Sequence, residues 1–467
     1  MPEMTTSARR ETDEIFRRSV RIERPAPEVF AWHERPGAFA RLCPPWERVE
    51  VLAHVGGIRD GARVSLRTRI GPFWTAWEIV HRDYVAGRQF RDVLLRGPFA
   101  KWEHLHLIEP AGPGACVLTD EIRYRLPLGA LGRLGGAALA RRQLERMFVY
   151  RHAVTKADTE GATAGPRRCV LVTGASGLIG RGLVAFLRTQ GHVVRSLGRG
   201  TPRGPDEFQW DPAAGKIDPA ALAGVDAIVH LAGENVAGGR WTAARKAAIL
   251  ASRVQGTRTL AAAIAACAPS ARPEVLVSAS AVGYYGHRGD ERLSEAAAAG
   301  DGFLAEVCQA WEREVAAVEP LGVRTVALRT GVVLTPAGGA LAKMLPAFRA
   351  GVSGRLGSGR QWMGWIAPDD LAAMYERALL DPVWRGPCNA VAPEPVTNAE
   401  FTATLARVLR RPAVLPTPAF LLKLIFGRMA EDTLLVSTRA MPERARATGF
   451  TWRHAELEAA LRHVLGR

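Results

Sequence analysis

The chain has 467 residues, a formal net charge of +16 and 48% apolar residues. This length exceeds what one hydrophobic core supports and fits two or three domains, each with enough apolar residues for a core. The chain contains neither the roughly 20 consecutive apolar residues of a membrane helix nor the apolar core of a secretion signal, so we expect a cytoplasmic protein with no membrane partner. Six widely spaced cysteines agree with a reducing compartment.

The positive charge comes almost entirely from arginine. Six lysines accompany 56 arginines, which are spread along the chain and form no basic arm. Because nucleic-acid-binding motifs are missing as well, we expect no nucleic-acid partner, while an acidic small molecule is compatible with this charge. The sequence leaves a homodimer open.

The first third of the chain is predicted to be mainly β-strand. Over residues 62–70, apolar positions such as Val64 and Leu66 alternate with arginines and a serine, which indicates one buried and one exposed face. Similar patterns, separated by turns that contain glycine or proline, cover residues 73–80, 90–95, 101–108 and 116–126. Helical patterns after Pro25 and over residues 131–157 would cover one face of this antiparallel sheet.

This order of elements resembles the helix-grip fold of the polyketide cyclase and START-like superfamily. The resemblance implies an α+β domain over residues 1–158 that holds an apolar ligand between the sheet and the last helix. Trp74, Trp77, Phe99 and Trp102 would line that cavity or, alternatively, form a plain aromatic core.

His104 and His106 lie two residues apart on one predicted strand, so their side chains share a face. They could ligate a metal ion or be ordinary core or surface histidines. Because the sequence identifies no third ligand, it predicts no metal site.

Residues 159–168 are small and polar without periodicity, which is typical of a linker. Strand patterns then alternate with helical ones, which predicts an α/β Rossmann domain with a parallel sheet over residues 169–400. The predicted strands cover residues 170–173, 192–197, 227–231, 275–278 and 324–328. One predicted helix follows the first strand and ends near residue 189, and two others cover residues 243–266 and 302–318. We expect a small, mostly helical C-terminal domain over residues 401–467.

A glycine-rich turn opens the α/β domain. Residues 169–180 have the sequence Cys-Val-Leu-Val-Thr-Gly-Ala-Ser-Gly-Leu-Ile-Gly, a buried strand followed by three spaced glycines and an amphipathic helix. Dinucleotide folds need glycines here for a tight turn, close approach to the pyrophosphate and close helix–strand packing, with the phosphates at the helix N-terminus. The predicted cofactor-binding residues of this turn are Gly174, Ser176, Gly177, Leu178, Ile179 and Gly180.

The end of the second strand of this domain indicates which dinucleotide binds. It carries Arg199, with Arg195 as a weaker candidate, and no acidic residue. A ribose 2′-hydroxyl is usually bound by a carboxylate and a 2′-phosphate by a guanidinium, so Arg199 predicts NADP as the cofactor.

Four segments resemble the landmarks of extended short-chain dehydrogenases of the sugar-nucleotide epimerase type: residues 173–180, 230–233, 278–286 and 365–371. More narrowly, the chain looks like an atypical NAD-dependent epimerase-like subfamily with an uncharacterised C-terminal domain, similar here to residues 418–427 and 449–450. The resemblance implies cofactor contacts by Leu231, Ala232, Gly233 and Ser278.

The parent superfamily uses a serine or threonine, a tyrosine that transfers a proton, and a lysine four residues later. None of the six tyrosines here has a lysine at that spacing, and Phe303 and Val307 stand in the tyrosine and lysine places. The remaining candidates for catalysis are Ser280, Tyr284 and Tyr285, and His287 or Glu306 could also supply the proton.

We expect an atypical NADP-dependent oxidoreductase or epimerase-like protein that acts on a small molecule through a substitute acid. A second hypothesis is a non-catalytic dinucleotide-binding sensor or scaffold, favoured by the missing tyrosine and lysine. A third places the activity in the first domain, as a lipid or polyketide binding module.

Overall fold

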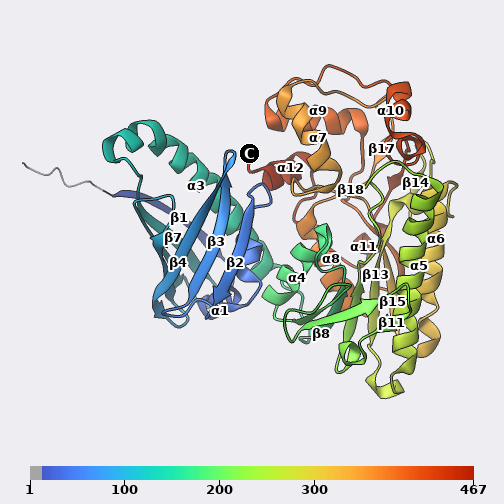
Figure 1. Ribbon diagram of the computed structural model, residues 1–467, viewed down its shortest axis with the longest axis horizontal. Helices are drawn as coiled ribbons and strands as arrows, with labels where there is room; N and C mark the ends of the chain where they lie inside the picture. Colours follow the sequence, from blue (N-terminus) through green and yellow to red (C-terminus); the bar gives the residue numbers. More distant parts are fainter. Residues whose placement is uncertain (1–12) are drawn as a thin grey trace, which may run out of the picture. The chain divides into compact units, whose positions relative to one another are not determined.

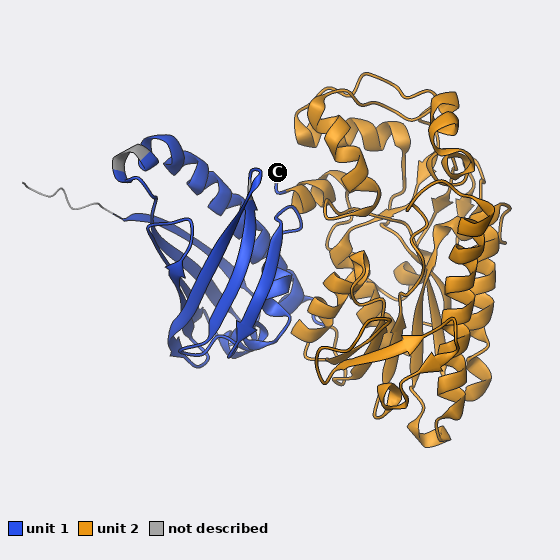
Figure 2. Ribbon diagram, in the orientation of Figure 1, with its two compact units in different colours: residues 1–162, 466 blue, residues 163–465, 467 orange. Residues whose placement is uncertain are grey.

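The computed structural model describes residues 13–467, without the side chains of residues 70, 130 and 131. The chain divides into two compact units, with the boundary after Ala162 (Figure 2). Unit 1 also includes Gly466, and unit 2 contains the other residues from Thr163 onward. Within the described range, the helices lack the combination of length and apolar content that crossing a membrane requires.

Unit 1 is a seven-stranded antiparallel sheet with helices on one face (Figure 1), which confirms the predicted helix-grip fold. The strand order is β1-β7-β6-β5-β4-β3-β2. The strands are β1 (Glu14–Ile22), β2 (Val49–Val55), β3 (Arg63–Ile70), β4 (Phe73–Val85), β5 (Gln89–Arg96), β6 (Lys101–Pro110) and β7 (Cys116–Arg125). The helices are α1 (Ala26–Glu34), α2 (Ala38–Leu42) and α3 (Gly129–Glu160).

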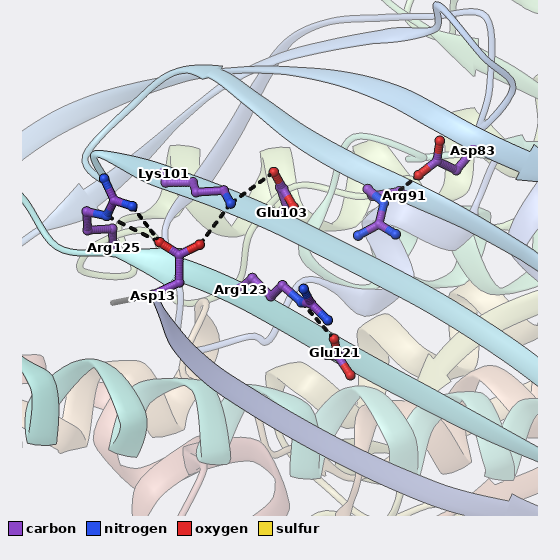
Figure 3. Close-up of polar contacts among 8 residues, drawn as sticks. All are labelled: Asp13, Asp83, Arg91, Lys101, Glu103, Glu121, Arg123 and Arg125. Atoms are coloured by element: carbon purple, nitrogen blue, oxygen red, sulfur yellow. Dashed lines mark hydrogen bonds and ion pairs between the residues drawn. The ribbon is translucent and has the colours of Figure 1, made fainter. Parts of the chain in front are cut away.

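The outward face of this sheet carries paired charges (Figure 3). Lys101 Nζ lies 2.8 Å from Asp13 Oδ2 and 3.3 Å from Glu103 Oε1, and Arg125 Nη2 lies 2.8 Å from Asp13 Oδ1. Further pairs on this face are Arg91 with Asp83 and Arg123 with Glu121. Because side chains alternate along a strand, the intervening residues of β6 and β7 point to the opposite face.

The inward face packs against α3. Trp102 and Tyr124 of the sheet form a core with Phe148 of α3, and Trp77 and Phe99 pack against it. This packing agrees with the aromatic-core alternative. Trp74, in contrast, is 46% exposed beneath the Arg67 guanidinium, so it lines no interior space.

Unit 2 is built on an eight-stranded sheet with the order β11-β10-β9-β8-β12-β13-β15-β19. All pairs are parallel except β10 with β11, which confirms the predicted Rossmann architecture. The strands are β8 (Cys169–Thr173), β9 (Val193–Gly198), β10 (Glu207–Asp211), β11 (Lys216–Ile217), β12 (Ala227–His230), β13 (Val275–Ala281), β15 (Arg324–Thr330) and β19 (Gly386–Ala390).

Helices cover both faces of this sheet (Figure 1). On one face, α4 (Leu178–Thr189) and α8 (Pro368–Leu380) pack on inward valines such as Val170 and Val172. On the other, α5 (Ala243–Ala266) and α6 (Phe303–Ala316) pack on the neighbouring positions of the same strands, such as Leu171. Each central strand is therefore apolar on both sides, as its continuous apolar sequence requires.

The C-terminal part of unit 2 forms a third core from α7 (Gly339–Ala350), α9 (Asn398–Leu409) and α12 (Leu457–Leu465). The remaining α-helices here are α10 (Ala419–Phe426) and α11 (Glu443–Ala447), with a π-helical turn at Ala430–Leu434 between them. Six two-residue strands join these segments to the rest of unit 2: β14 (Arg292–Leu293), β16 (Val332–Val333), β17 (Trp362–Met363), β18 (Trp365–Ile366), β20 (Val396–Thr397) and β21 (Arg439–Ala440). The pairing of β14 with β21 ties the C-terminal segment to the loop after β13.

Candidate nucleotide site

Two positions in the turn between β8 and α4 accommodate only glycine. Gly174 has a φ of +68°, a backbone conformation that side chains rarely adopt. A Cβ on Gly180 would lie 2.2 Å from the Gly174 carbonyl oxygen, well inside van der Waals contact. Gly177 N donates to the same oxygen at 2.9 Å, which closes the turn. Backbone therefore packs directly against backbone in this turn. The absence of side chains lets a pyrophosphate approach the backbone closely.

The N-terminus of α4 is open to a ligand. Ser176, Gly177 and Leu178 are exposed, and among residues 13–467 no side chain caps this helix. The first amide groups of a helix have no partner within the helix and carry its positive dipole end, so they bind phosphates well. The structure thus groups Gly174, Ser176, Gly177, Leu178, Ile179 and Gly180 at one helix N-terminus.

Thr173 connects the glycine turn to the segment after β12. Its Oγ1 accepts hydrogen bonds from Leu231 N and Ala232 N, both at 3.1 Å, and so its proton is donated to His230 Nδ1 at 2.8 Å. A Cβ on Gly174 would lie 3.0 Å from Ala232 N, which shows how closely the two segments approach. The predicted cofactor residues Leu231 and Ala232 therefore lie beside the turn.

His230 is held in one tautomer. With Nδ1 accepting from Thr173, its Nε2 donates to Thr257 Oγ1 at 3.2 Å, and the Thr257 hydroxyl donates to Arg253 O. Burial lowers the pKa of His230 to about 3, with the positive charge of Arg253 adding to the effect. His230 is thus a neutral structural link that fixes the loop carrying Leu231 to Gly233.

The two arginines after the turn differ in what they contact. Arg195 Nη1 donates to Ala223 O at 2.5 Å, and its guanidinium lies 5.6 Å from the centre of the Phe208 ring. Arg199 follows β9 and is exposed, and no described side chain is bonded to its guanidinium. Arg199 is therefore the arginine that is available to a ligand.

The predicted serines lie on β13. Ser278 is fully buried, and its Oγ donates to Ala279 O at 3.0 Å. It pairs in register with His230 of β12, which places it beside the cofactor segment. Ser280 is also buried, and its Oγ donates to Glu312 Oε1 at 2.6 Å.

A buried ion pair joins two of the predicted catalytic residues. Arg329 is bidentate to Glu312, with Nε–Oε1 at 2.9 Å and Nη2–Oε2 at 2.8 Å. Arg329 Nη1 also donates to the Tyr285 hydroxyl at 3.0 Å, and that hydroxyl donates to Asn389 Oδ1 at 2.7 Å. Ser280 and Tyr285 are thereby connected through Glu312 and Arg329.

The tyrosine environments are not alike. Tyr285 is fully buried, and burial raises its pKa to about 12. Tyr284 is half-buried, with the Arg329 guanidinium 3.4 Å from the centre of its ring. The Tyr285 hydroxyl is hydrogen-bonded to other side chains of the protein, whereas Tyr284 contacts Arg329 through the face of its ring.

Phe303 and Val307 of α6, which we predicted to stand in the tyrosine and lysine places, make apolar contacts. Val307 is 2% exposed, and Phe303 packs edge-on against Trp241 with ring centres 5.0 Å apart. Lys246 of α5 places Nζ 4.9 Å from the centre of the Phe303 ring. Sequence reasoning missed this lysine because it comes from another helix.

Arg253 of α5 was also missed. Its guanidinium carbon would lie 3.1 Å from a Cβ on Gly233, so a cation adjoins the predicted cofactor residue Gly233. Arg253 Nη1 donates to Glu234 O at 3.2 Å and Ile249 O at 3.0 Å. No local motif marks it, because its relation to Gly233 depends on how α5 packs.

A parallel sheet, a backbone-packed glycine turn at the carboxyl end of β8 and an open helix N-terminus define unit 2 as a dinucleotide-binding Rossmann domain of the short-chain dehydrogenase type. The chain belongs to the NAD dependent epimerase/dehydratase family, whose model matches residues 170–386. Residues 417–464 match a domain of unknown function, DUF1731, and residues 14–160 match polyketide cyclase / dehydrase and lipid transport proteins.

Three relatives support this assignment. An epimerase family protein of Mycobacterium bovis is 42% identical over 64% of this chain and 98% of its own length. The crystal structure of a nucleoside-diphosphate sugar epimerase from Corynebacterium glutamicum is 34% identical, with a TM-score of 0.79 over 97% of this chain and 90% of that one. The human epimerase family protein SDR39U1, solved with NADPH, is 36% identical, with a TM-score of 0.58 over 63% of this chain and 98% of that one.

Proposed function

We propose that unit 2 binds NADP(H) and acts as an atypical oxidoreductase or epimerase on a small molecule. The observation that carries the proposal is the glycine turn, where Gly180 leaves no room for a side chain beside the exposed N-terminus of α4. The exposed Arg199 guanidinium supports NADP(H) over NAD(H) because it can pair with a 2′-phosphate. The NADPH in the structure of the human relative supports the same choice.

Each group of residues has a separate task in this proposal. The amides of residues 174–180 bind the diphosphate, Arg199 binds the 2′-phosphate, and Leu231 to Gly233 with Ser278 line the remainder of the dinucleotide site. Bound NADP(H) supplies hydride transfer. The chain itself must orient the cofactor and provide the proton that accompanies the hydride.

We assign the proton transfer to Tyr284. The alternatives are less suitable because the Ser280 hydroxyl already donates to Glu312 and the Tyr285 hydroxyl is buried between Arg329 and Asn389. We propose that Ser280 and Tyr285 position Tyr284 through Arg329, whose guanidinium lies against the Tyr284 ring. The cation on the ring face fixes where the Tyr284 side chain lies.

A second candidate function is binding without turnover, as a sensor or scaffold. It is favoured by Phe303 and Val307, which have no titratable group at the positions where relatives of the superfamily carry tyrosine and lysine. Under this proposal the same NADP(H) contacts apply, and Tyr284 has no catalytic part.

Titration with NADPH and NADH, followed by NADPH consumption across a library of carbonyl compounds, separates these functions. We expect tighter binding of NADPH, and turnover that Tyr284→Phe lowers at least roughly 100-fold, as for other general acids. Tyr84→Phe, in unit 1, is the matched control and should retain full rate. Tight NADPH binding without turnover would support the second function, and absence of binding would reject both.

A further inference from the structure

Unit 1 contains a cluster of histidines and carboxylates on the inward face of its sheet. Adjacent strands place Asp92 of β5 opposite His104 of β6, and His106 of β6 opposite Asp120 of β7. Both histidines and Asp120 are buried. The neighbouring β6 residues Lys101 and Glu103 point to the outward face, where Figure 3 shows them paired with each other and Asp13. The cluster is therefore a feature of the interior and does not belong to the surface charge pairs.

Three side chains of this cluster converge on one point. His104 Nδ1 and His106 Nε2 each lie 3.5 Å from Asp92 Oδ2. The three ligand atoms all lie within 4.8 Å of one another. Two ligands that are about 2.1 Å from one metal ion at a tetrahedral angle are about 3.4 Å apart, so both distances from Asp92 Oδ2 match shared coordination.

A second carboxylate, Asp120, orients His104 from behind and lies next to His106. His104 Nε2 donates to Asp120 Oδ1 at 2.8 Å, and His106 Nδ1 lies 2.8 Å from the same oxygen. His152 of α3 contacts the other oxygen, Oδ2, at 2.6 Å. Metal-ligating histidines usually turn their second nitrogen to a carboxylate in this way, which fixes the tautomer and directs the free lone pair at the metal.

With both imidazoles neutral, the side of the cluster that faces Asp92 consists of acceptors. When His104 gives its Nε2 proton to Asp120, its Nδ1 carries a lone pair that faces the Asp92 carboxylate. His106 has the same conflict at Nε2 if its proton is on Nδ1. Two acceptors that face each other in a buried site repel, so protons or a metal ion must lie between them.

We propose that Asp92, His104 and His106 bind one divalent first-row transition-metal ion, with Asp120 as the carboxylate that orients His104 and lies behind His106. One divalent ion offsets the charges of the buried Asp120 and the partly buried Asp92. Two imidazoles with one carboxylate suit zinc, manganese or iron(II), whereas calcium and magnesium prefer oxygen ligands alone. His81 lies beside the carboxylate that ligates the metal, with its Nε2 3.1 Å from Asp92 Oδ1. Binding releases any protons held by the two ligand imidazoles.

The test uses the full chain without a histidine tag, stripped of metal with a chelator and titrated with cobalt(II) as a spectroscopic probe and with zinc. We expect one equivalent of metal by elemental analysis and a visible cobalt spectrum that zinc abolishes. Asp92→Asn should weaken binding at least 100-fold, while Asp120→Asn should weaken it about 10- to 100-fold through loss of orientation. His54→Gln is the matched control because His54 is exposed on β2 of the same unit, and it should bind like the unaltered chain.

Circular dichroism and thermal unfolding establish that each protein is folded before it is titrated. If Asp92→Asn does not fold, nitrogen hyperfine coupling from two imidazoles in the cobalt or copper spectrum of the unaltered chain replaces it as evidence. The proposal is overturned if the folded, unaltered chain binds no cobalt or zinc at 100-fold molar excess. It is equally overturned if Asp92→Asn binds as tightly as His54→Gln, and the cluster is then a network whose charge is balanced by protons.

Discussion

The buried pair of Glu312 and Arg329 gives the sharpest test of how unit 2 is held together. Glu312→Gln keeps the volume of the side chain but removes the charge that Arg329 pairs with. Arg329 is 3% exposed on its side chain and Glu312 is 15% exposed, so water can replace little of the lost interaction. The substitution also weakens the bond from Ser280, because Glu312 Oε1 accepts from both residues.

Breaking a buried pair by removal of one partner costs about 3–5 kcal/mol, since the other charge stays buried. For a unit of this size, about 2 °C per kcal/mol gives a fall in Tm of roughly 6–10 °C. The matched control is Glu314→Gln, two residues along α6. Its partner Arg258 is 66% exposed, so loss of that pair should cost at most about 1 kcal/mol.

Scanning calorimetry measures both variants, and the transition of unit 1 should stay in place as an internal reference. The expected result is a large shift of the unit 2 transition for Glu312→Gln and almost none for Glu314→Gln. Equal shifts for the two variants would refute the reasoning, because they would mean that the network around Arg329 contributes no more than a surface pair.

Two further predictions concern the nucleotide turn. Gly180→Ala should destabilise unit 2 by about 1–3 kcal/mol in urea unfolding and abolish NADPH binding, because the new Cβ meets the Gly174 carbonyl oxygen at 2.2 Å. The control is Gly182→Ala on the same helix, whose Cβ would have no neighbouring atom within 4 Å. It should be neutral or stabilising by up to about 1 kcal/mol in the same assay. The His230 pKa of about 3 lies below its unfolded value near 6.5, so the unfolded chain binds the proton more readily and stability falls as pH drops through that window. Between pH 7 and pH 5, urea titrations should show about 2 kcal/mol more loss for the unaltered chain than for His230→Asn, and parallel curves would contradict this assignment.

The sequence was sufficient for features that depend on local pattern. The strand–turn–helix at residues 169–180 was recognisable because one short segment contains the strand, the glycines and the helix. The order of elements in the helix-grip fold was recognisable because apolar and polar residues alternate regularly along most of its strands. By contrast, β2, β10 and the two-residue strands were not identified, since short or exposed strands have little apolar periodicity.

The sequence was not sufficient for contacts that depend on strand register. Asp92 is twelve residues from His104, and only the pairing of β5 with β6 places them side by side, so the third side chain of the cluster could not be found. In the same way, Glu312 and Arg329 come from α6 and β15, and neither carries a local signal. The hydrogen bonds that join Ser280 to Glu312 and Tyr285 to Arg329 could therefore be found only from the structure.

The central claim is that unit 2 is an NADP(H) site, and equilibrium titration of charge-reversed variants tests it most directly. NADPH and NADH would be titrated into the unaltered chain, Arg199→Glu, and Arg203→Glu as an exposed control four residues away. We predict that the unaltered chain and Arg203→Glu bind NADPH at least 10-fold more tightly than NADH, and that Arg199→Glu removes or reverses this preference. Equal affinity for the two dinucleotides in the unaltered chain, or an unchanged preference in Arg199→Glu, would contradict the account.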